Sequence, residues 1–178
     1  MLVQTTKLKG CVIIEPSVFG DNRGFFLETF SRQRYFEEAG IKLEFVQDNH
    51  SRSAANVLRG LHFQKTKPQG KLVRVVRGCV FDVAVDLRPK SVTFGQWISV
   101  ELSEQNKKQL WVPPGFAHGF TALSNDTELE YKCTAYYDPE DEDSILWSDP
   151  QLSIPWPVTK PILSAKDADA GLLKDLQL

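Results

Sequence analysis

Two of the three histidines in this sequence have neighbours that suit acid–base chemistry. His62 lies within Arg59–Gln64 (RGLHFQ), and His118 lies within Trp111–Phe120 (WVPPGFAHGF). A histidine between glycines and apolar residues is open to a small ligand yet shielded from bulk water, and such surroundings favour a neutral, basic imidazole. Both residues are therefore candidate proton carriers. A lone histidine is more often structural, and for His118 both readings stay open.

Lys71 and Tyr131 are polar residues on strand faces that otherwise read as buried. Alternate residues of a β-strand point to the same face, so Lys71 lies with Val73, and Tyr131 lies with Leu129 and Cys133. A lysine at a strand end can reach water, and a buried tyrosine can bond a backbone carbonyl. Each residue alone therefore has a structural explanation.

Gln47 and Asn49 repeat the pattern, because they share a face with Phe45. Polar side chains that point inward from several strands are uncommon in a packed core. Their joint occurrence predicts a barrel whose interior is a polar pocket.

The elements that must hold these side chains read as many short β-strands. Between residues 57 and 137, β-branched and aromatic runs alternate with Gly, Pro, Asn and Asp at the spacing of antiparallel strands. We expect strands at Lys71–Val76, Cys79–Leu87, Gly95–Leu102, Gln109–Val112, Gly119–Leu123 and Leu129–Ala135. The first two strands are expected to form a hairpin around Arg77 and Gly78. A sandwich, a jelly roll or a barrel fits this pattern.

Helical signals are few and short. Ser31 is a plausible N-cap for a helix that ends at Gly40, with Phe30 and Phe36 packed inward. Near the C-terminus, Ser164–Asp167 resembles a capping box with an aspartate in the third helical position. The expected fold is mainly β with short flanking helices.

Length and charge exclude several classes of protein. The 178 residues predict one domain spanning 1–178, and 21 Lys and Arg against 23 Asp and Glu give a formal charge of −2. No nucleic acid partner is expected, because no broad positive field exists. The longest hydrophobic run, Cys11–Ile14, is too short for a membrane span or a secretory signal. We expect a soluble, cytoplasmic protein with reduced thiols and no membrane partner.

The run Pro113–His118 resembles the second conserved motif of the cupin superfamily, and His62 lies where the first motif begins. Metal-binding cupins supply a closely spaced histidine pair and a downstream glutamate from that first motif. This chain has Phe63 and Gln64 after His62, and residues 65–78 contain neither an acidic residue nor a histidine. A tightly held metal is therefore not expected.

A longer and more specific set of motifs occurs in one order along nearly the whole chain. It comprises Gly20–Phe26 (GDNRGFF), Gln47–Ser51 (QDNHS), Leu58–His62 (LRGLH), Gln69–Arg74 (QGKLVR), Tyr131–Thr134 (YKCT) and Leu163–Asp167 (LSAKD). Together these motifs resemble the RmlC family of dTDP-4-dehydrorhamnose 3,5-epimerases. The resemblance implies a cupin-type jelly-roll barrel, a place in dTDP-rhamnose biosynthesis, and the substrate dTDP-4-dehydro-6-deoxyglucose.

The chemistry of such a substrate explains the candidate residues. C3 and C5 of the sugar both lie alpha to the C4 ketone, so epimerisation needs a base, an acid on the opposite face and a group that stabilises the enolate. By resemblance, His62 is the base and Asp167 orients its ring. Tyr131 is implied as the proton donor, and Lys71 as the cation beside the C4 oxygen. No redox cofactor and no metal are implied.

The resemblance also implies a set of residues that bind the substrate. They are Phe19, Arg23, Glu28, Gln47, Asn49, Arg59, Lys71, His118, Tyr137, Glu142 and Lys166. The two arginines offer bidentate contacts to the diphosphate, the two amides suit thymine or ribose, and Phe19 or Tyr137 can stack on the base. Proteins of this family form homodimers by exchange of N-terminal strands, for which Cys11–Ile14 is a candidate.

Three alternatives remain open from the sequence. A relative on the same scaffold inverts only C3 or only C5 of a similar sugar. A noncatalytic jelly roll binds a sugar nucleotide without exchange of hydrogen with solvent. A metal-dependent cupin enzyme holds Fe, Mn or Zn.

Overall fold

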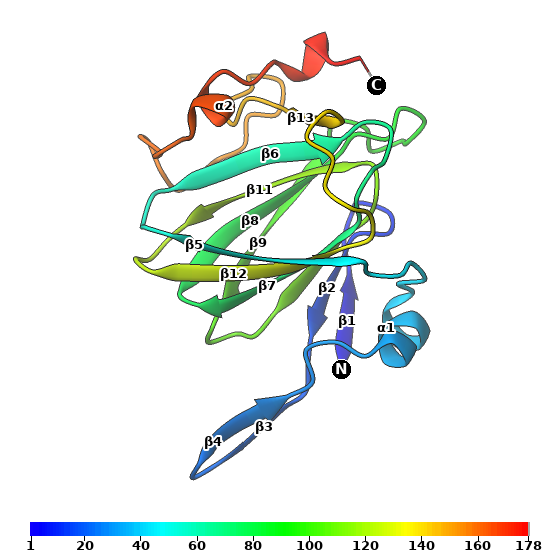
Figure 1. Ribbon diagram of the computed structural model, residues 1–178, viewed down its shortest axis with the longest axis vertical. Helices are drawn as coiled ribbons and strands as arrows, with labels where there is room; N and C mark the ends of the chain where they lie inside the picture. Colours follow the sequence, from blue (N-terminus) through cyan, green and yellow to red (C-terminus); the bar gives the residue numbers. More distant parts are fainter. Residues whose placement is uncertain (178) are drawn as a thin grey trace.

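Two antiparallel β-sheets face each other in this computed structural model, which describes residues 1–177 (Figure 1). The six-stranded sheet runs β1 (Leu2–Thr5), β2 (Val12–Glu15), β10 (Gln109–Val112), β7 (Lys71–Arg77), β12 (Thr127–Cys133) and β5 (Gln47–Ser53). The five-stranded sheet runs β13 (Glu142–Ser144), β6 (Leu58–Gln64), β11 (Phe116–Ala122), β8 (Cys79–Asp86) and β9 (Trp97–Ser103). A separate hairpin, β3 (Val18–Asp21) with β4 (Gly24–Leu27), projects from the body. The prediction of a mainly β fold is confirmed.

The alternation predicted for the strands is present on the inner face of the six-stranded sheet. Lys71 and Val73 point inward with 9% and 0% of their surface exposed, and Leu129 and Cys133 are both 0% exposed. Tyr131 lies between these last two along the strand and packs against an apolar cluster that includes Val73 and Leu129. Apolar residues from both sheets fill part of the interior.

The predicted hairpin of Lys71–Val76 with Cys79–Leu87 is wrong. Both strands exist, but β7 pairs with β10 and β12, whereas β8 pairs with β11 and β9 in the opposite sheet. Gly78 adopts a φ of +77°, and a Cβ there would lie 2.5 Å from the Ser124 hydroxyl oxygen. Glycine adopts this φ without strain, and at this turn the chain passes from one sheet to the other.

The first helix, α1 (Arg32–Ala39), begins and ends where the sequence predicts. Ser31 caps its N-terminus, and Gly40 ends it in the left-handed region with a φ of 68°. Phe30 packs inward as expected, but Phe36 is 50% exposed, so that prediction is wrong. Tyr35 is the buried helical side chain, and Phe36 points about 100° away around the helix axis.

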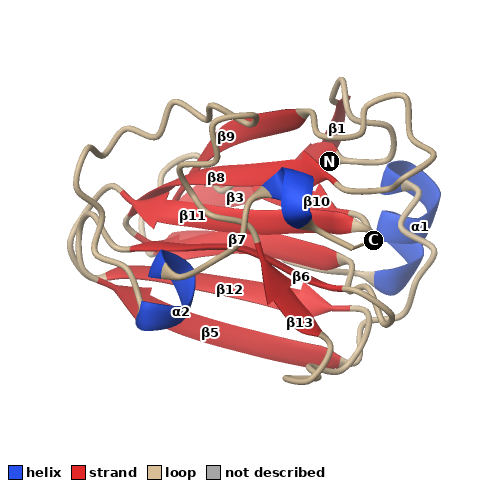
Figure 2. Cartoon of the chain, turned by 90° about the horizontal axis from the view of Figure 1, so that it is seen from above, coloured by secondary structure: helices blue, strands red, loops and turns tan. Residues whose placement is uncertain are grey.

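The C-terminal segment after β13 crosses the outside of the five-stranded sheet (Figure 2). It contains α2 (Ala165–Ala168), which Ser164 caps as predicted, and a short 3₁₀-helix, Leu173–Asp175. Leu152 and Leu173 of this segment pack against Leu61 of β6. None of the helices formed by residues 1–177 has the length and apolar character that a membrane crossing requires.

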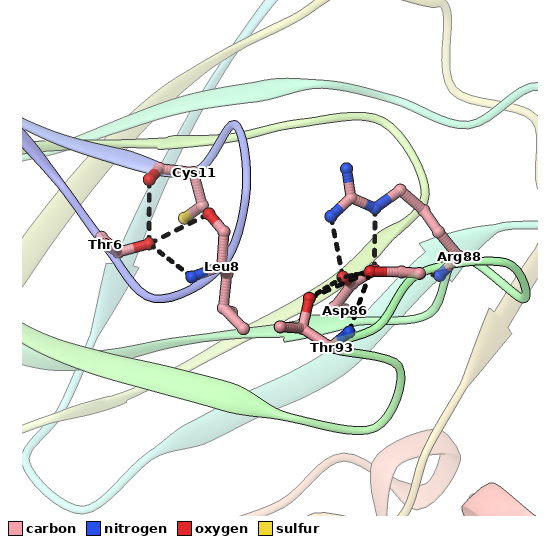
Figure 3. A network of polar contacts seen from close by, with 7 residues as sticks. Thr6, Leu8, Cys11, Asp86, Arg88 and Thr93 are labelled. Carbon is pink, nitrogen blue, oxygen red and sulfur yellow. Dashed lines mark hydrogen bonds and ion pairs between the residues drawn. The ribbon is translucent and has the colours of Figure 1, made fainter.

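Polar side chains hold two connections between strands, the one from β1 to β2 and the one from β8 to β9 (Figure 3). The Asp86 carboxylate is 0% exposed and accepts hydrogen bonds from the guanidinium of Arg88 and from the hydroxyls of Ser91 and Thr93. Burial alone would raise the pKa of Asp86, but these hydrogen bonds hold it far below its usual range. The Thr6 hydroxyl donates to the Cys11 carbonyl in the neighbouring turn. Asp86 thus stays ionised and fastens the loop that joins β8 to β9.

Candidate active site

A cavity of about 350 Å³ opens between the two sheets. It is lined by Gln47, Asn49, Ser51, Arg59, His62, Gln69, Lys71, His118, Phe120, Tyr131, Tyr137 and Glu142. The polar interior expected from strand alternation is therefore present. Most residues named from the sequence lie in this one cavity, and Ser51, Gln69 and Phe120 are additions that the sequence did not single out.

His62 projects from β6 and bonds the carboxylate of Asp167. The distance between His62 Nε2 and Asp167 Oδ1 is 2.5 Å. The carboxylate is 3% exposed and also accepts from the Ser164 hydroxyl at 2.8 Å and from the Gly60 N–H at 3.4 Å. Burial would raise the pKa of Asp167, but the bonds from His62, Ser164 and Gly60 outweigh it and lower that pKa. The ionised carboxylate can orient the ring and stabilise an imidazolium.

Tyr131 projects into the cavity from β12 in the opposite sheet. Burial, with the nearby Cys133 and Glu142, raises the pKa of Tyr131 to about 12. The phenol is therefore protonated at neutral pH and can donate a proton. Because His62 and Tyr131 come from facing sheets, a ligand between them meets a base on one side and an acid on the other.

Lys71 on β7 supplies a buried amine to the lining of the same cavity. Its burial lowers its pKa, and the nearby Cys133, Glu142 and Asp82 oppose that effect through charge alone. No hydrogen bond from a residue in 1–177 is among the causes that shift the pKa of Lys71. The protonated form of this amine is suited to stabilise an oxyanion that forms during a reaction.

His118 on β11 forms a second imidazole–carboxylate pair. Its Nε2 lies 2.9 Å from Asp82 Oδ1 and 3.1 Å from Oδ2. Asp82 is 0% exposed; burial raises its pKa, while His118 and Lys71 act in the opposite direction. The sequence reading missed Asp82, although the signal was present, because Asp82 shares strand parity with the buried Val80 and Ala84.

The rim of the cavity is tied together by polar contacts. The Tyr137 hydroxyl donates to Glu142 Oε2 at 2.8 Å, and Lys166 of α2 forms an ion pair with the same carboxylate. The Tyr137 backbone N–H donates to Gln47 Oε1 at 2.9 Å, and Gln47 Nε2 donates to Asn49 Oδ1 at 3.0 Å. Lys166 thus reaches the cavity through Glu142.

Phe19, Arg23 and Glu28 do not reach the cavity of their own chain. Phe19 and Arg23 line a separate groove on the projecting hairpin, where Arg23 pairs with Asp21 at 2.5 Å. Glu28 follows β4 and pairs with Arg34 of α1 at 3.2 Å. Sequence order could not reveal this separation, because it depends on the direction in which the hairpin leaves the sheet.

Metal ligands are the remaining question about the cavity. Within residues 1–177, no group of three or more His, Cys, Asp or Glu side chains is arranged to hold a metal ion. The expectation that the protein needs no metal or redox cofactor stays a prediction from the sequence.

Comparisons with known proteins agree over almost the full chain. The family model described as dTDP-4-dehydrorhamnose 3,5-epimerase matches residues 5–175. The Salmonella typhimurium protein of that name is 57% identical over 175 residues, covering 97% of this chain and 96% of the relative. Its Escherichia coli counterpart is 53% identical over 178 residues, covering 99% and 96%.

Comparison with solved structures identifies the fold of the chain. The RmlC epimerase of Legionella pneumophila, in complex with dTDP-4-keto-L-rhamnose, is 54% identical with a TM-score of 0.96, covering 99% of this chain and 94% of that chain. This similarity confirms the predicted cupin-type jelly-roll barrel. The chain belongs to the dTDP-4-dehydrorhamnose 3,5-epimerase family.

Proposed function

We propose that this protein is an isomerase that inverts C3 and C5 of dTDP-4-dehydro-6-deoxy-D-glucose to give dTDP-4-dehydro-L-rhamnose. The observation that carries the proposal is the placement of His62 and Tyr131 on facing sheets of one cavity, with Lys71 beside them. The names of the relatives support the same reaction.

The reaction needs only proton transfers and charge stabilisation. His62 removes the proton alpha to the ketone, and the electron pair of that C–H bond moves into the enolate with negative charge on the C4 oxygen. Lys71 stabilises that oxygen. Tyr131 then delivers a proton to the opposite face of the same carbon, which inverts it. His62 then releases its proton to solvent and Tyr131 takes one up, after which the same steps at the second alpha carbon complete the reaction.

The remaining cavity residues are proposed to hold the nucleotide and the sugar. The Arg59 guanidinium is fixed by Ser53 Oγ at 3.1 Å and by the Arg52 carbonyl at 3.2 Å, which leaves it oriented for a diphosphate. Gln47 and Asn49 suit thymine or ribose, and Tyr137 can stack on the base. Glu142, Lys166 and His118 complete the proposed contacts.

We further propose a homodimer in which the β3–β4 hairpin of one chain supplies Phe19 and Arg23 to the cavity of its partner. Within residues 1–177 the hairpin strands pair only with each other, and Phe19, Phe25 and Phe26 are 66%, 59% and 69% exposed. Apolar side chains gathered on a projecting element mark an interface. Cys11–Ile14, the segment expected to exchange, falls largely in β2, which is paired on both sides within its own chain.

Mixing of variant subunits tests this arrangement. Arg23→Ala and His62→Ala chains should each form poorly active homodimers. A heterodimer should regain one intact cavity that joins the His62 of one chain to the Arg23 of the other. Random 1:1 assembly therefore restores about a quarter of the wild-type sites, measured as turnover after coexpression.

The control mixes Arg59→Ala with His62→Ala chains. Both residues lie in the cavity of their own chain, so no heterodimer site is intact and turnover should stay low. An equal lack of recovery in the Arg23 mixture would contradict the exchanged hairpin.

Hydrogen exchange with solvent tests the reaction itself. The purified protein is incubated with the substrate in deuterated water, and the sugar is read by NMR. Deuterium at both C3 and C5 of an inverted product is expected. Label at one carbon alone would identify a single-site epimerase, and no label would identify a binding protein.

A single domain over residues 1–178 and a cytoplasmic location stay predictions from the sequence.

A further inference from the structure

Asp167 is held by a segment that belongs to neither sheet. The C-terminal segment after Ser144 meets the barrel before α2, where Ile162 exchanges backbone hydrogen bonds with Leu58 and Asn56 at 3.0 and 2.9 Å. After α2 the segment returns to its own beginning, where the Gly171 carbonyl accepts from the Leu146 N–H at 2.8 Å. The position of Asp167 relative to His62 therefore depends on how these flanking stretches are fastened.

Asp149 is a buried carboxylate that closes this segment into a loop. Its side chain is among the most buried polar groups, with the residue 2% exposed. Oδ1 accepts from the N–H groups of Gln151 and Leu152 at 2.8 and 2.9 Å, and Oδ2 accepts from the Leu173 N–H at 2.8 Å. One charged group thus joins the start of the segment to a residue beyond α2. Hydrogen bonds to an ionised acceptor are stronger than neutral ones.

The two stretches that Asp149 joins pack directly behind the proposed base. Leu152 and Leu173 are each 4% exposed and belong to one apolar cluster with Leu61 and Phe63. Leu61 and Phe63 are the neighbours of His62 on β6, and their side chains point to the face opposite the cavity. The segment therefore packs on the face of β6 that points away from the cavity, directly behind His62.

We propose that Asp149 is a positioning residue that holds Asp167 in hydrogen-bond contact with His62. The inference rests on the proposed function, because it concerns the base of that reaction. Loss of the Asp149–Leu173 contact frees the residues after α2, and Asp167 then spends less time at the short distance to His62. A displacement of about 1 Å at a reacting group can cost up to about 100-fold in rate.

The test is a double-mutant cycle on turnover. Asp149→Asn keeps the size of the side chain, but a single amide cannot accept from N–H groups on both sides as the carboxylate does. We expect kcat to fall between about 10- and 100-fold with KM changed less than about twofold. In an Asp167→Ala background, where there is no carboxylate left to position, Asp149→Asn should lower kcat by less than about twofold.

The matched control is Asp169→Asn, which removes an exposed carboxylate from the same segment and should leave kcat unchanged. Amide hydrogen exchange shows whether the folded variant is loosened, and we expect faster exchange at Leu173 and in α2 with the β-strands unchanged. These measurements separate positioning from a general loss of folded protein.

Each other outcome has a distinct meaning. An equally large fall from Asp149→Asn in both backgrounds, or normal kcat of Asp149→Asn beside a crippled Asp167→Ala, would overturn the role of Asp149 and leave the proposed function intact. Normal kcat of Asp167→Ala itself would overturn the proposed imidazole–carboxylate pair and, with it, the role of Asp149.

Discussion

Turnover of the dTDP-4-keto sugar falls by about 10²- to 10⁴-fold when His62 is replaced by alanine. His62 is the imidazole whose Nε2 lies 2.5 Å from a buried, ionised carboxylate, and the proposed mechanism contains no second base at this position. Loss of the ring should also stop the exchange of substrate hydrogens with deuterated water, because the carbon–hydrogen bond is then not broken. Both quantities are read from one NMR time course.

Binding of the nucleotide should survive the same substitution. The proposed nucleotide contacts come from other residues, so the Kd for dTDP measured by calorimetry should change less than about threefold. His50→Ala is the matched control, since His50 lies near Glu128 at 3.4 Å on the outside of the barrel and its side chain is 51% exposed. Retention of deuterium exchange in His62→Ala would contradict the assignment of the base.

Replacement of Tyr131 by phenylalanine should separate proton removal from inversion. The variant keeps the ring and loses only the hydroxyl, whose pKa of about 12 keeps it protonated at neutral pH. Formation of inverted product should fall by about 10²- to 10⁴-fold. Deuterium should still enter at least one alpha carbon of the recovered sugar, because His62 and Lys71 remain in place.

Tyr35→Phe provides the control for this experiment. Tyr35 is also buried, and burial is the main reason that its pKa is likewise raised to about 12. Its hydroxyl donates to Gln109 Oε1 at 2.8 Å, beneath α1. Its loss should cost about 1 kcal/mol of stability and leave inversion intact. Normal inversion by Tyr131→Phe would show that the acid is another group.

Strand alternation predicted the inner face of the barrel well. Lys71, Tyr131, Gln47 and Asn49 all line the cavity, as their parity with apolar neighbours indicated. Phe45 has the same parity as the two amides, but it precedes β5 in the chain and packs on Phe30 and Trp111. The period of two is reliable only while the strand continues.

Features that depend on the third dimension could not be predicted in the same way. The predicted β7–β8 hairpin is wrong because these two consecutive strands lie in opposite sheets, and a Gly at the turn fits either arrangement. Family motifs named Phe19 and Arg23 as ligands, but only the direction of the hairpin shows that they are remote from their own cavity. The contact of Asp149 with Leu173 carries no sequence signal, because the two residues are 24 positions apart.

A crystal structure with a dTDP-4-keto sugar bound decides whether His62 and Tyr131 act on opposite faces of one ring. We expect the pyranose between them, with each group within about 3.5 Å of a reacting carbon and Lys71 Nζ about 3 Å from the C4 oxygen. A sugar bound outside this cavity, or one that has both groups on the same face, would contradict inversion by this pair.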